Sequence, residues 1–345
     1  MGEKLSVDLR AGGLGDVWMR LVGFHAAAAL RPGLRVSAAV PDVLYDIASA
    51  GFGGRLEVAT EAEAGEVTYS VRGLRDLLPS ALRGRRWAAP YGRVVIRDWN
   101  RWRVRDRLNS LAYAGADFCG LVYSPPWDSL AWYQGYSEIV LLPSLRMIKP
   151  EEFNCQVAAD LPDISRRVAR HAAACPVPGP ESVDGRLVVF PTGSARQFIP
   201  LEWAKAHLGD AVFALHESEP DSGRWRDAGL AVVVYATPGQ IAALGRRARI
   251  ALTTDSFPSH VLQYAGAEVV VLITEAARRR VVSPGFGGRV IDAVAPCHPC
   301  PHLERRAAPR CKAGHEVCLN WESPVYAAEI REVLMEDERW RMEKS

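Results

Sequence analysis

Short apolar runs alternate with amphipathic stretches along almost the whole chain. In the first part, strand-like and helix-like segments follow one another at 4–10, 16–30, 34–40, 41–50, 55–60, 93–98 and 101–116. Alternation of this kind is typical of parallel sheets whose strands are joined by crossover helices. The first part of the chain therefore predicts an α/β domain.

A second series of the same kind begins after a polar, helix-like stretch at 149–174 and a stretch rich in proline and glycine at 175–185. Its strand-like runs lie at 185–194, 211–217, 230–237, 250–255 and 267–274. A chain of 345 residues is long enough for two ordinary domains. We predict an α/β fold of two facing Rossmann-like domains.

The boundaries that we expect follow from these changes in pattern. We expect a first domain at 1–165, a linker at 166–184 and a second domain at 185–296. A cysteine segment at 297–318 and a C-terminal helix at 319–345 would follow.

Composition places the chain among ordinary globular proteins. Hydrophobic residues make up 48% of it and charged residues 24%, with a formal net charge of +2. No apolar run reaches the roughly 20 residues of a membrane span, and the N-terminal MGEKLSVDLR lacks the apolar centre of a secretion signal. We therefore expect a cytoplasmic protein without a transmembrane segment.

A glycine-rich turn joins the first predicted strand to the first predicted helix in RAGGLGDVWMRL, residues 10–21. The fingerprint of dinucleotide-binding proteins fails here, because Trp18 stands where its third glycine is needed and no Walker lysine follows. Asp16 either caps the helix or accepts a proton from an attacking hydroxyl. Gly13 and Gly15 would let a substrate come close to the backbone.

Two strand-to-helix loops of the second domain carry polar side chains suited to phosphate. Thr192, Ser194 and Arg196 lie in the first loop. Asp255, Ser256 and His260 lie in the second. Because open α/β sheets bind ligands at the carboxyl ends of their strands, these loops predict a nucleotide site.

Four motifs in order, GGLGDVWM, PTGSARQFIPLEWAKAHL, TTDSFPSHVLQYAGAEVVVL and PVYAAEIREVL, resemble glycosyltransferase family 9, the ADP-heptose lipopolysaccharide heptosyltransferases. The resemblance implies the two-domain GT-B fold, with acceptor bound by the first domain and nucleotide sugar by the second. It also implies inverting transfer without a metal in the chemistry, and it makes Asp16 the base.

The resemblance extends to further donor residues and shows two departures. Gln197 stands where the family has a lysine that binds the diphosphate, so Arg196 would take that part. Phe257 replaces the glycine that follows Asp255 and Ser256 in the family motif. Glu217, with Glu219 as the alternative, would contact the nucleoside.

Four cysteines lie within 22 residues, with the spacing C-x2-C-x10-C-x6-C. Cys297, Cys300, Cys311 and Cys318 predict a tetrahedral structural metal knuckle, and free thiols are the alternative. Zinc is the default metal. Iron is the alternative, because some protein heptosyltransferases that the chain resembles hold iron on four cysteines here. His298, His302 and His315 are reserve ligands.

Nine arginines and only two aspartates occur between Arg83 and Arg107. This stretch is either a solvated helix or the binding face for an anionic acceptor, with Arg97, Arg101 and Arg105 on one helical face. The acceptor would be a glycan such as lipopolysaccharide core. Two alternatives remain open: a glycosyltransferase that modifies a hydroxymethylated DNA base, and a non-catalytic nucleic-acid-binding protein on a transferase scaffold.

Overall fold

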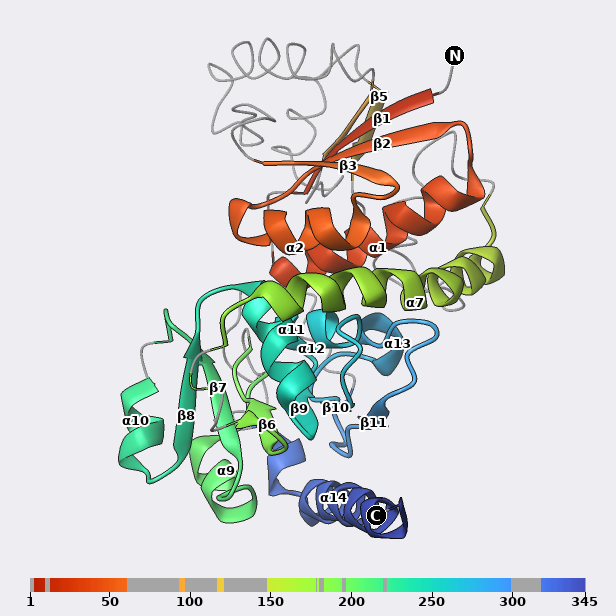
Figure 1. Ribbon diagram of the computed structural model, residues 1–345. Coiled ribbons are helices and arrows are strands. Elements are labelled where there is room, and N and C mark those ends of the chain that lie inside the picture. Colours follow the sequence, from red (N-terminus) through yellow and green to blue (C-terminus); the bar gives the residue numbers. More distant parts are fainter. Residues whose placement is uncertain are drawn as a thin grey trace, which may run out of the picture. The chain divides into compact units, whose positions relative to one another are not determined.

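The computed structural model describes residues 3–9, 13–60, 93–96, 117–120, 148–177, 179, 183–193, 197–219, 222–298 and 318–344. The chain divides into two compact units (Figure 1). The first contains Met1–His171 with two short later pieces, Thr237–Gly239 and Ser283–Phe286. The second contains the remainder.

The first unit is built on a parallel sheet of five described strands. They are β1 (Glu3–Asp8), β2 (Leu34–Ala39), β3 (Leu56–Ala59), β4 (Arg93–Ile96) and β5 (Asp117–Gly120). Their order is β3-β2-β1-β4-β5, and every neighbouring pair is parallel. The strand that begins the chain therefore lies in the middle of its sheet.

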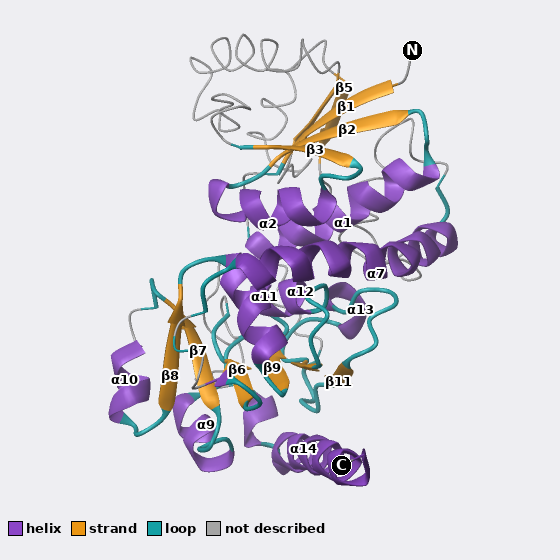
Figure 2. Cartoon of the chain, in the orientation of Figure 1, coloured by secondary structure: helices purple, strands orange, loops and turns teal. Residues whose placement is uncertain are grey.

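Three helices of the first unit are described, α1 (Leu14–Leu30), α2 (Asp42–Phe52) and α7 (Pro150–Ala174). In Figure 2, α1 and α2 lie on one side of the sheet, and α7 runs beside them. A Cβ atom at Gly51 of α2 would lie 3.1 Å from a methyl carbon of Val168, so α2 and α7 are in close contact. The buried side of α7 carries Phe153, Val157, Ile164 and Val168 at helical spacing.

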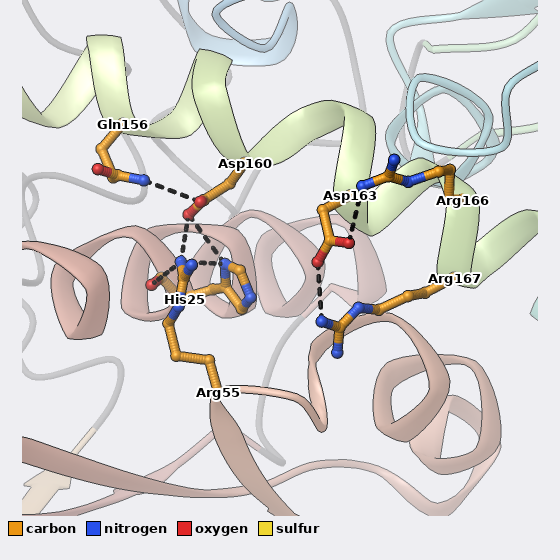
Figure 3. A network of polar contacts seen from close by, with 7 residues as sticks. All are labelled: His25, Arg55, Gln156, Asp160, Asp163, Arg166 and Arg167. Carbon is orange, nitrogen blue, oxygen red and sulfur yellow. Dashed lines mark hydrogen bonds and ion pairs between the residues drawn. The ribbon is translucent and has the colours of Figure 1, made fainter.

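Asp160 lies within this apolar stripe of α7 and is only 5% exposed. A buried carboxylate needs charged or hydrogen-bonding partners, and three surround it (Figure 3). His25 Nδ1 of α1 donates at 2.9 Å, the Arg55 guanidinium at 2.6 Å and the Gln156 amide at 2.8 Å. Burial alone would raise the pKa of Asp160, but the hydrogen bonds and charges of His25 and Arg55 outweigh it and lower that pKa.

The second unit is built on a parallel sheet of six described strands. They are β6 (Leu187–Phe190), β7 (Val212–His216), β8 (Ala231–Tyr235), β9 (Ile250–Thr254), β10 (Val269–Leu272) and β11 (Arg289–Ile291). Their order is β11-β10-β9-β6-β7-β8. All residues of β9 and β10 are buried, as in a sheet covered on both faces.

The helices of the second unit are short, apart from the last. They are α9 (Leu201–His207), α10 (Ser222–Asp227), α11 (Pro238–Arg247), α12 (Phe257–Leu262), α13 (Arg278–Val281), the 3-10 helix η3 (Leu319–Glu322) and α14 (Pro324–Lys344). Trp321 of η3 packs on Trp203 and on Tyr326, with ring centroids 4.7 Å and 5.1 Å apart. The C-terminal segment is thus part of the core of this unit.

Two parallel sheets with crossover helices confirm the predicted α/β fold with two Rossmann-like sheets. The short strands β5 and β11 were not predicted from the apolar pattern, and α1 begins at Leu14. No helix within the described residues is both long and apolar enough to cross a membrane.

Candidate functional site

The second sheet reverses its strand order between β6 and β9. From β6 the chain builds β7 and β8 on one side, then crosses back to build β9, β10 and β11 on the other. In open α/β sheets, ligands bind outside the carboxyl ends of the strands at such a reversal. The described donor-site candidates that follow β6 and β9 are Thr192, Gln197, Asp255 and Ser256.

The loops after β6 and β9 approach each other closely at Gly193. A Cβ atom there would lie 2.1 Å from the backbone oxygen of Gln197 and 2.7 Å from Cβ of Ser256. Both distances are too short for any side chain, so this turn requires glycine. The Thr254 hydroxyl donates to the Gln197 carbonyl oxygen at 3.0 Å and joins the two loops.

Ser256 and His260 are both placed by α12, and both side chains are buried. Ser256 is the N-cap residue of this helix, and its hydroxyl lies 3.1 Å from the Thr254 hydroxyl. The Ser256 carbonyl accepts a hydrogen bond from the Ser259 hydroxyl at 2.8 Å. These contacts give the loop after β9 a fixed conformation.

Asp255 is enclosed by protein. It is 1% exposed, and its carboxylate accepts hydrogen bonds from the Thr274 hydroxyl, the Glu275 amide at 3.2 Å and the Ala276 amide at 2.8 Å. Burial raises the pKa of Asp255, and these donors oppose that rise because they stabilise the charged form. In this geometry the carboxylate holds the loop after β10.

A second polar group lies at the carboxyl ends of β6, β7 and β8. Thr192 lies near Tyr235, whose pKa is raised by burial and by the charge of Glu219. The Glu217 amide donates to the Tyr235 carbonyl oxygen at 2.8 Å, while the Glu217 side chain is exposed. The Glu219 side chain is half-buried, and it lies close enough to Tyr235 for its negative charge to raise the pKa of the tyrosine.

The first unit has its own strand-order reversal, between β1 and β4. Asp16 lies in the first turn of α1, which follows β1, and its side chain is half-buried. Gly13 is the N-cap residue of α1, so Asp16 lies in the first turn of the helix and not at the N-cap position itself. A Cβ atom at Gly13 would lie 3.6 Å from Asp16 Oδ2, which places the carboxylate beside the glycine turn.

Several predicted site residues lie outside the described residues. They are Arg97, Arg101, Arg105, Ser194, Arg196, Cys300 and Cys311, together with the reserve ligands His302 and His315.

Two of the four cysteines are described, and neither forms a disulfide. Cys297 is exposed, and Cys318 is the partly buried N-cap residue of η3. Within the described part of the chain, no group of three or more histidine, cysteine or acidic side chains could hold a metal ion. The reserve ligand His298 contacts the loop after β10, because its Nε2 atom lies 2.8 Å from the Ala276 carbonyl oxygen.

Sequence patterns did not reveal three further residues at this edge of the second sheet. Thr274 only ends an apolar run, Asn320 lies two residues after Cys318, and Tyr326 lies in the motif PVYAAEIREVL, which indicates a family resemblance but no specific contact. Asn320 is fully buried and donates to the Thr274 carbonyl oxygen at 2.7 Å. No local sequence motif predicts the hydrogen bond between Asn320 and Thr274, because 46 residues separate them.

Solved structures of glycosyltransferases are similar to the chain over almost its full length. A family 9 glycosyltransferase from Veillonella parvula has a TM-score of 0.60 and 15% identity, with 98% of each chain covered. The ADP-heptose lipopolysaccharide heptosyltransferase II of Escherichia coli has a TM-score of 0.54 and 13% sequence identity, with 97% of this chain and 99% of that chain covered. The iron-containing dodecameric glycosyltransferase TibC of enterotoxigenic E. coli has a TM-score of 0.57 and 11% sequence identity, with 100% of this chain and 81% of that chain covered.

No protein-family profile and no curated protein sequence matches the chain. At identities of 11–15% the structural likeness establishes the fold. The strand orders, the loops at their reversals and these similarities together show that the chain has the fold of the family 9 glycosyltransferases.

Proposed function

We propose that this chain transfers a glycosyl group from a nucleotide sugar to a hydroxyl of an anionic acceptor. The observation that carries the proposal is the close approach of two loops at the β6–β9 reversal. This approach is possible because residue 193 is a glycine and has no Cβ atom. Backbone that comes this close to a strand edge can cradle a diphosphate. The fold likeness to solved heptosyltransferases supports a sugar nucleotide as the ligand.

In the proposed reaction, the acceptor oxygen bonds to the anomeric carbon from the face opposite the diphosphate. The bond from that carbon to the diphosphate oxygen breaks, and its electron pair stays with the diphosphate. Because attack and departure occur on opposite faces, the configuration of the anomeric carbon inverts. Asp16 takes the acceptor proton. Arg196 and the hydroxyls of Thr192, Ser194 and Ser256 would stabilise the charge that develops on the leaving group.

We assign donor binding to residues 185–296 and acceptor binding to residues 1–165. Gln197, Glu217, Asp255 and His260 remain candidate donor residues, with Glu219 as the alternative to Glu217. Gly13, Gly15 and the arginines at 97, 101 and 105 remain candidates for the acceptor, for which we propose a phosphorylated glycan.

The test is titration of the full chain with ADP-, UDP- and GDP-sugars, followed by transfer to phosphorylated core glycan. We expect one nucleotide to bind at micromolar to millimolar concentration and the product to have the inverted anomeric configuration. Failure of every nucleotide sugar to bind at millimolar concentration would reject the enzyme. Transfer to hydroxymethylcytosine-containing DNA, but not to glycan, would replace the glycan acceptor.

We further propose that Cys297, Cys300, Cys311 and Cys318 hold one zinc or iron ion as a structural site. The described residues fit this, because Asn320 Oδ1 accepts hydrogen bonds from the Val294 and Ala295 amides at 3.1 and 2.8 Å. The chain just before Cys297 and the chain just after Cys318 are thus held together. Thiolates suit either metal, and TibC is described as iron-containing.

Metal analysis of protein purified without chelators should find one zinc or iron per chain. Replacing the four cysteines with serine should remove the metal and lower the thermal midpoint, while the affinity for the nucleotide sugar stays near normal. A wild-type protein without stoichiometric metal would contradict the site.

A further inference from the structure

Trp321 carries a buried polar atom that makes no hydrogen bond. The side chain is 6% exposed, and its indole Nε1 atom has no hydrogen-bond partner among the described residues. A buried donor without an acceptor costs stability, so buried polar groups of folded proteins are nearly always bonded. An exception of this kind points to an acceptor that arises in another state of the protein, such as a bound ion and its ligands.

Cys318 lies beside Trp321 in the 3-10 helix η3. It is the N-cap residue, and its carbonyl oxygen accepts a hydrogen bond from the Trp321 amide at 3.0 Å. Side chains three residues apart in a 3-10 helix lie above one another on the same face. Accordingly, Cys318 packs against the buried cluster that contains Trp321.

Tyr326 borders the same place, but its hydroxyl is already used. The ring packs on Trp321 with centroids 5.1 Å apart, and the hydroxyl donates to the Ile273 carbonyl oxygen. Burial raises the pKa of this hydroxyl, and the charges of Asp255 and Cys318 raise it further, so the cysteine sulfur lies near the two rings. The Tyr326 hydroxyl therefore serves the loop after β10, whereas the indole N–H of Trp321 is available to the sulfur.

Asn320 fixes η3 and with it the positions of Cys318 and Trp321. Its side chain is fully buried and accepts the two backbone amides of residues 294–295 at 3.1 and 2.8 Å. It also donates to the Thr274 carbonyl oxygen at 2.7 Å. The helix that carries the cysteine and the tryptophan is therefore held in place before any metal binds.

A metal-bound cysteine is the kind of acceptor that this indole lacks. A thiol loses its proton when it binds zinc or iron, and the sulfur then carries negative charge. Negative charge beside apolar rings requires a hydrogen-bond donor, whereas a neutral thiol is only a weak acceptor. Donors to the ligand groups of a metal orient those groups and strengthen metal binding.

We propose that the indole N–H of Trp321 donates a hydrogen bond to the metal-bound sulfur of Cys318. Trp321 is then a positioning residue of the metal site, which orients the thiolate and stabilises its charge. This inference rests on the four-cysteine site proposed above. The spacing of the cysteines does not reveal this residue, because tryptophan is not itself a ligand of zinc.

Trp321→Phe tests the contact, because it removes the N–H and keeps an aromatic ring. Trp203→Phe is the matched control: Trp203 packs on Trp321 with ring centroids 4.7 Å apart, and the change removes the same atoms from the same cluster. Competition with a chromophoric chelator measures the zinc affinity of the full chain. We expect Trp321→Phe to weaken zinc binding about tenfold and Trp203→Phe to leave it within about twofold of wild type. Equal zinc affinities in the two variants would overturn the inference.

Nuclear magnetic resonance of the metal-loaded wild type provides a second measurement, which holds even where Trp321→Phe does not fold. Cadmium with a magnetic nucleus replaces zinc, and the tryptophan nitrogens carry an isotope label. We expect one indole N–H resonance to move downfield on metal binding and to couple to the cadmium nucleus through the sulfur. Neither shift nor coupling in a metal-loaded wild type would contradict the hydrogen bond. A wild type that binds no stoichiometric metal would instead reject the four-cysteine site, and the inference with it.

Discussion

Gly193 and Asp255 show how packing decides what a residue can do. At Gly193 any side chain would overlap the Gln197 carbonyl oxygen and Ser256, so residue type and loop conformation are inseparable. At Asp255 the resemblance to family 9 implies donor binding, yet the carboxylate is enclosed and bonded to the loop after β10. Its effect on a donor would therefore pass through that loop.

Gly193→Ala should weaken binding of the nucleotide sugar about tenfold or more, because the added Cβ forces the two strand-end loops apart. Calorimetric titration measures the effect. Gly223→Ala is the control, since a Cβ at Gly223 would have no atom within 4 Å. Unchanged donor affinity in Gly193→Ala would separate this turn from the donor site.

At the scale of elements, α7 packs in the first unit through an apolar stripe that contains one charged residue, Asp160. The charged partners of Asp160 are His25 of α1 and Arg55 in the turn after α2, so the ion network joins three elements (Figure 3). Asp163 makes a different kind of contact. It pairs with Arg166 and Arg167 on the surface of the same helix, and pairs of that kind contribute little.

Asp160→Asn should lower the free energy of unfolding by about 1–3 kcal/mol near neutral pH, because it leaves His25 and Arg55 without their carboxylate. The pKa of Asp160 is lowered in the folded state, so its stabilisation is present above the ordinary aspartate pKa of about 3.9 and is lost as the pH falls through the folded value. The difference between variant and wild type should therefore shrink from pH 7 toward pH 3.

Urea unfolding at a series of pH values measures this difference, with Asp163→Asn as the control on the same helix. Asp163 also has a lowered pKa, but it is well exposed, and its replacement should change stability much less. A difference for Asp160→Asn that grows as the pH falls would contradict the assigned role of the carboxylate.

The elements show what the sequence can and cannot predict. Apolar runs predict β9 and β10 because strands buried on both faces are continuously apolar. The four-residue β5 and three-residue β11 carry too few apolar positions for such a signal. Contacts such as His25 with Asp160, 135 residues apart, depend on tertiary packing that no local pattern records.

At the scale of the whole molecule, the described strands of each unit include a strand-order reversal, and the candidate residues are divided between the two units. We propose the loops at the reversal in the second unit as the diphosphate site, while Asp16 lies in the helix that follows the central strand of the first unit. Donor binding and proton removal are therefore assigned to different units. A change at Asp16 should alter the reaction without altering the affinity for the donor.

Asp16→Asn tests this division, because asparagine has nearly the same shape as aspartate but cannot take up the acceptor proton. Turnover should fall about 100-fold or more, the usual contribution of a positioned general base, while calorimetry finds the wild-type affinity for the nucleotide sugar. Asp42→Asn is the matched control, since Asp42 is an exposed acid in the first turn of α2 in the same unit. Near-normal turnover in Asp16→Asn would leave Asp16 as a carboxylate that only stabilises the start of α1.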